Sequence, residues 1–65
     1  MKGVFKGEDH KSLGSAYYNL GLAYYRINDL GNASKAFAES YRIRVYCYGP
    51  EHLDTQNARH FLNEL

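Results

Sequence analysis

The sequence has little of the residues that cross-link or interrupt a chain: one cysteine, one proline and no tryptophan in 65 residues. A single cysteine excludes an intramolecular disulfide, although a chain this short buries only about 60% of its unfolded surface. We interpret Cys47 as a small apolar residue on a helix, and a lone thiol fits a reducing, cytoplasmic location. Pro50 follows Gly49, which is typical of the end of a helix.

The sequence also lacks a block of like charge and a long apolar run. Eight basic and seven acidic residues leave a net charge of +1, without the basic patch that nucleic-acid binding usually needs. No apolar run approaches the roughly 20 residues of a membrane span. Residues 1–7 have no apolar core long enough for a secretory signal. We therefore expect neither a membrane nor a nucleic acid as the partner.

Tyrosine is the residue that is present in excess, at seven positions. Its ring packs well in a shallow core and equally well at an interface, because one end is apolar and the other can hydrogen-bond. We therefore expect thin helical layers, with some tyrosine rings left over for a partner.

The first predicted helix covers roughly residues 9–28. Ser12 provides a capping hydroxyl near its start. Steps of three and four residues then separate the members of one apolar face: Leu13, Ala16, Tyr17, Leu20, Ala23, Tyr24 and Ile27. Gly21 lies within this face at a cost of roughly 1 kcal/mol against alanine. The sequence therefore predicts that another helix approaches closely at Gly21.

A second helix is predicted over roughly 30–48 and a third over 52–64. Asn28 suits the left-handed exit from the first helix, and Asp29 is a strong N-cap for the second. A corner this short makes the first two helices an antiparallel hairpin. The second helix should end at Gly49, and Glu39 and Arg42 are spaced for an ion pair within it. The predicted fold class is all-α.

An internal repeat connects the two ends of the sequence. Gly7-Glu8-Asp9-His10 resembles Gly49-Pro50-Glu51-His52 at an offset of 49 − 7 = 42 residues. The same offset pairs Ala16 with Ala58 and Leu20 with Leu62 in the same helical phase. We therefore predict one module over 1–65. It divides into the tail of a preceding helix (1–7), one complete repeat (8–49), and the first helix of the next repeat or a cap (50–65).

One set of residues matches the spacing of the tetratricopeptide repeat signature: Tyr17, Leu20, Gly21, Tyr24, Ala33, Phe37 and Ser40. The 42-residue period and the Gly-Pro-Glu-His corner resemble the longer variant found in kinesin light chains and bacterial repeat arrays. The sequence departs from that variant at Leu53, where proline is usual, and at Asn28, where glycine is usual. It departs again at Arg59 and Asn63 in the third helix.

This resemblance implies a protein-interaction module that binds a peptide or protein segment on a concave face. The residues implied to line that face are Ser15, Tyr18, Asn19, Leu22, Tyr25, Arg26, Asn57 and His60, with Asn63 or Glu64 beside them. The clamp that binds C-terminal carboxylates in this family is not matched, because Tyr18 and Leu22 occupy its places.

Two alternatives remain open. Repeat arrays usually need about three units for stability, and this chain has about one and a half. It is therefore expected to be an excerpt of a longer array or a homo-oligomer, in which Tyr18, Leu22 and Tyr25 could be buried against another copy. RNA binding is a weaker alternative, because the charge is nearly balanced.

Catalysis, metals and cofactors are not expected. His52 and His60 are not spaced to share a metal, and the recurrence of His10 and His52 at the same corner favours a structural role. The glycines are too far apart for a phosphate-binding loop. Ser12, His10 and Asp9 share one helical turn without the cleft that catalysis requires.

Overall fold

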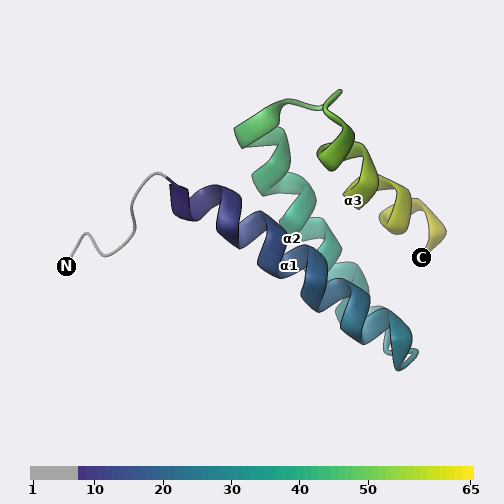
Figure 1. The fold of residues 1–65 in the computed structure, drawn as a ribbon. Helices are drawn as coiled ribbons and strands as arrows, with labels where there is room; N and C mark the ends of the chain where they lie inside the picture. The colour runs from purple at the N-terminus through teal and green to yellow at the C-terminus, as the bar shows by residue number, and fades with distance from the viewer. Residues whose placement is uncertain (1–7) are drawn as a thin grey trace.

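The computed structural model describes residues 8–65, which form α1 (Glu8–Arg26), α2 (Leu30–Tyr48) and α3 (Leu53–Glu64). No strand occurs in these residues, so the all-α prediction is confirmed. α1 and α2 form an antiparallel hairpin, and α3 packs on α2 (Figure 1). The tail of a preceding helix predicted for residues 1–7 lies outside the described residues. No helix among those described is long and apolar enough to cross a membrane.

The α1–α2 corner follows the predicted local chemistry. Asn28 adopts a left-handed φ of 65°, and the Asp29 carboxylate accepts a hydrogen bond from the Asn32 backbone N–H at 3.4 Å. The backbone N–H of Asp29 donates to the carbonyl of Tyr24 at 2.8 Å, which closes the end of α1. Because of this closure α1 ends at Arg26, two residues before the predicted boundary at 28.

The α2–α3 corner is closed by Gly49 and His52. Gly49 has a φ of 94°, and its N–H donates to the carbonyls of Arg44 and Val45 at 3.2 and 2.9 Å. His52 is the N-cap of α3, and its Nδ1 accepts the Asp54 N–H at 3.0 Å. The third helix therefore begins at Leu53, one residue after its predicted start.

The core is small and centred on Phe37. Its fully or almost fully buried hydrophobic residues are Ala33, Ala36, Phe37 and Ala58. A Cβ placed on Gly21 would lie only 2.8 Å from the Phe37 ring, so the predicted close approach at Gly21 is confirmed. The Ser40 hydroxyl donates to the carbonyl of Gly14 at 2.8 Å and joins α1 to α2 a second time.

Several residues predicted to form apolar helix faces are exposed. Among residues 11–26 of α1, Gly14 and Gly21 are the buried ones, whereas Leu20 is 43% exposed and Ile27, just after the helix, is 70% exposed. The closest contact of α1 with α2 is thus made at the two glycines, whereas Tyr17, Leu20 and Tyr24 of the predicted apolar face border a hollow between α1 and α2. Leu13, Ala16 and Ala23 of the same predicted face are exposed as well, and so are Leu30 at the start of α2 and Leu53 at the start of α3.

Candidate functional site

The residues predicted for the concave face lie on α1 and α3, which both pack on α2. Tyr18 and Leu22 are half-buried. The exposed members are Ser15, Asn19, Tyr25, Arg26, Asn57 and His60. This predicted set keeps the name concave face below.

The structure brings three of these residues together around Phe61. The rings of Tyr18, Tyr25 and His60 meet the Phe61 ring edge-to-face, with centroid distances of 5.8, 5.7 and 5.6 Å. Phe61 in turn stacks on Phe37 at 4.7 Å with the rings almost parallel. The aromatic part of the concave face is therefore continuous with the core.

The polar members of the concave face are not brought into one cluster. Within residues 11–65 the side chains of Ser15, Asn19, Arg26 and Asn57 form no hydrogen bond to the protein, and all four are exposed. Their donors and acceptors remain available to a ligand. The site thus combines a fixed aromatic surface with unpaired polar groups on α1 and α3.

Sequence reasoning missed Arg44, a buried residue of α2 that contacts both Tyr18 and α3. Arg44 is only 8% exposed, and its Nη1 donates to the Asp54 carbonyl at 2.9 Å. Its guanidinium lies 4.6 Å from the Tyr18 ring centroid, a cation–π contact. The signal was present, because Arg44 follows Phe37 and Ser40 at helical spacing on the buried side of α2. Arg44 therefore fixes both Tyr18 and the start of α3.

Phe61 contacts three residues of the concave face but was not among the residues predicted for it. At the 42-residue offset it corresponds to Asn19, an exposed polar residue of α1. Its neighbours Tyr18 and Tyr25 are thus in contact with α3, so they belong to the fold as well as to the predicted surface.

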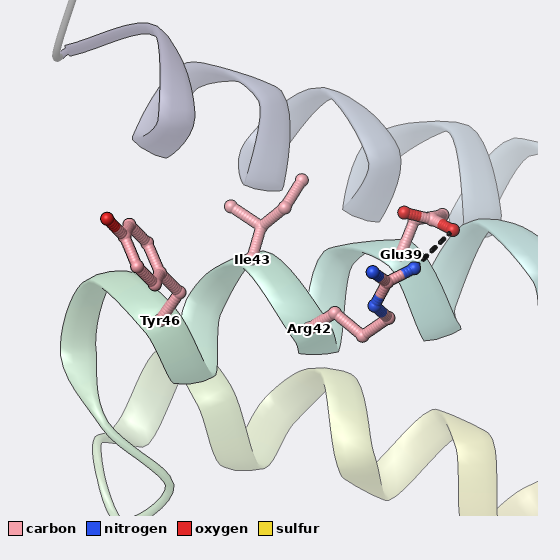
Figure 2. A pocket seen from close by; sticks show the side chains of 4 residues that line it. All are labelled: Glu39, Arg42, Ile43 and Tyr46. Atoms are coloured by element: carbon pink, nitrogen blue, oxygen red, sulfur yellow. Dashed lines mark hydrogen bonds and ion pairs between the residues drawn. The ribbon is translucent and has the colours of Figure 1, made fainter.

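The hollows in the surface lie elsewhere. One of about 200 Å³ is bordered by Tyr17, Leu20 and Tyr24 of α1 and by Lys35, Ala36 and Glu39 among the residues of α2. A second, of about 390 Å³, is lined by Glu39, Arg42, Ile43 and Tyr46 (Figure 2). Ile43 points toward α1, and the predicted ion pair between Glu39 and Arg42 is present at 3.2 Å. Neither hollow includes a residue of the concave face.

Among the side chains that the structure describes, those of residues 11–65, no three His, Cys, Asp or Glu are grouped so that they could bind an ion. The two histidines of residues 11–65 have other contacts, since His52 caps α3 and stacks on Tyr48 at 4.5 Å while His60 meets Phe61. Comparisons of this chain with family models, with curated proteins and with solved structures find no match.

Proposed function

We propose that the protein is a non-catalytic interaction module that binds a peptide or protein segment on its concave face, in the manner of tetratricopeptide-type hairpins. The observation that carries this proposal is the position of Tyr25. Its ring is 43% exposed, yet it is held edge-to-face against Phe61. A ring fixed in this way loses little further freedom when a ligand covers it.

Polar groups on the same two helices support the same proposal. Arg26 follows Tyr25 on α1, Asn19 lies six residues before Tyr25, and Asn57 lies on α3. None of these side chains has a partner within residues 11–65, so each can pair with a peptide backbone or carboxylate without breaking an existing bond. Rigid aromatic contact with adjacent polar donors is typical of protein-binding surfaces.

The proposal requires no cofactor and no catalytic group. We place the function in the cytoplasm, because Cys47 is free and a lone thiol suits a reducing compartment. The resemblance to tetratricopeptide repeats supports the choice of a peptide over a small molecule. This resemblance rests on the signature residues alone.

Selection from a random peptide library tests the proposal. Tyr25→Ala and Arg26→Ala should each lower the affinity for the captured peptides about tenfold or more. Tyr46→Ala is the matched control, since Tyr46 is an exposed tyrosine outside the concave face. Tyr18→Phe is preferred to Tyr18→Ala because it keeps the ring that Arg44 and Phe61 contact.

Two results would contradict the proposal. The first is that captured peptides bind Tyr25→Ala and Arg26→Ala as tightly as the unchanged protein. The second is that no peptide is captured while a salt-dependent RNA complex forms, which would favour the RNA-binding alternative.

A further inference from the structure

The side of α1 that faces away from α3 carries an exposed apolar surface. We name it the open face. Its exposed residues are Leu13, Ala16, Leu20, Ala23 and Ile27, and its two half-buried residues are Tyr17 and Tyr24. Leu13, Ala16, Leu20, Ala23 and Ile27 alternate steps of three and four residues, the spacing by which one helix packs along another. Where this side of α1 borders α2, a hollow is left beside Tyr17, Leu20 and Tyr24.

The open face is complementary to itself when it is reversed about Leu20. Positions equally distant from Leu20 face each other if a second α1 lies antiparallel on the first. Leu13 then meets Ile27, which are both large and apolar. Ala16 meets Tyr24, and Tyr17 meets Ala23, so each large ring lies opposite a methyl group. Alternation of large and small residues of this kind lets two helices interdigitate without voids.

The charges beside the open face obey the same symmetry. Gly21, next to Leu20, contacts Phe37, so the middle of the open face is level with Phe37 on α2. Lys35 and Glu39 stand two residues before and two residues after Phe37, and both border the hollow beside Leu20. A two-fold axis at Leu20 therefore brings Lys35 of each copy toward Glu39 of the other. The dimer would therefore contain two symmetry-related pairs of opposite charge, each between Lys35 of one copy and Glu39 of the other.

The hollow itself is suited to receive a side chain from the other copy. It measures about 200 Å³ and lies directly beside Leu20, with Tyr17, Tyr24 and Ala36 in its wall. A leucine at the axis can insert there from the opposite chain, and its own side chain is 43% exposed. Burial of such a residue contributes about 1.5–3 kcal/mol when complete.

From these relationships we infer that the open face binds a second copy of this chain, forming an antiparallel two-fold dimer centred on Leu20. The contact is isologous, since the same surface serves both partners, and it closes after two copies. It uses residues other than those of the concave face, so each copy keeps its concave face exposed. The dimer is therefore independent of the proposed peptide binding.

Sedimentation of the full chain tests this inference. The unchanged protein should be a dimer at micromolar concentration. Leu20→Asp should abolish the dimer, because two carboxylates would meet at the axis, while the helical circular dichroism is kept. Leu53→Asp is the matched control: Leu53 is 72% exposed on α3, and its change should leave the dimer intact. A monomer throughout, or equal effects of the two changes, overturns the inference.

Two further experiments keep the test decisive if Leu20→Asp unfolds. In a Cys47→Ser background, Leu20→Cys should form a cross-linked dimer on mild oxidation, whereas Leu53→Cys should not. Lys35→Glu and Glu39→Lys should each weaken the dimer a few-fold, and the double exchange should restore it. Cross-linking that is equal at both cysteine positions would contradict the two-fold arrangement.

Discussion

Gly21 of α1 and Phe37 of α2 are so close that a Cβ on the glycine would lie 2.8 Å from the phenylalanine ring. Phe37 is fully buried and also stacks on Phe61 of α3. The absence of one methyl group on α1 thus allows a single ring to join all three helices. The other buried apolar residues are all alanines, which bury little surface each. Packing around Phe37 is therefore the main hydrophobic contribution to the stability of the fold.

Gly21→Ala should therefore destabilise the protein by about 1–3 kcal/mol, because the added methyl group cannot be accommodated without displacing Phe37. This loss should occur although alanine favours helix by about 1 kcal/mol over glycine. Gly31→Ala is the control, since a Cβ there meets nothing within 4 Å. It should be neutral or stabilising. Urea unfolding of both variants measures the difference, and a shared sign would show that Phe37 adapts freely.

His52→Ala should weaken α3 by about 1 kcal/mol, because the Asp54 N–H loses the acceptor that Nδ1 provides. His52→Asp should retain most of the stability, since aspartate is also an N-cap. Hydrogen exchange of the α3 amides measures the effect locally. If His52→Asp were as damaging as His52→Ala, stacking on Tyr48 rather than capping would be the important contact.

Arg44→Met should loosen α3 from the hairpin by about 2 kcal/mol, since it removes the hydrogen bond to the Asp54 carbonyl and the cation–π contact with Tyr18. The aliphatic stem stays, so the loss reports the guanidinium. Arg42→Met is the control: Arg42 is exposed, and its ion pair with Glu39 should contribute less than about 1 kcal/mol. Equal thermal stability of the two variants would show that the Arg44 guanidinium does not stabilise the packing of α3 on the hairpin.

The corners could be predicted from the sequence because they depend on local chemistry. Asn28, Asp29 and Gly49 adopt the backbone conformations and caps that their residue types favour. Helix boundaries shifted by one or two residues, as at Arg26 and His52, where a capping hydrogen bond closes the helix earlier or later than periodicity indicates.

The close approach at Gly21 could be predicted, but the full orientation of α1 could not, because hydrophobic periodicity identifies an apolar stripe without saying what covers it. The side that contacts α2 is marked by Gly14 and Gly21, which give no hydrophobic signal. Burial of Arg44 escaped prediction for a related reason: its charge hides a position that lies on the same side of α2 as Phe37 and Ser40. Tyr18 could be placed beside the concave face, but not against Arg44 and Phe61.

The most direct test of the central claim is a two-dimensional NMR titration of the ¹⁵N-labelled protein with a selected peptide. We predict that the amide shifts concentrate on the concave face around Tyr25, Asn57 and His60. The amides of Lys35 and Glu39, which border the hollow beside the open face, should remain unchanged. Shifts confined to the open face, or a selected peptide that moves no amide of α1 or α3, would contradict the proposed binding surface.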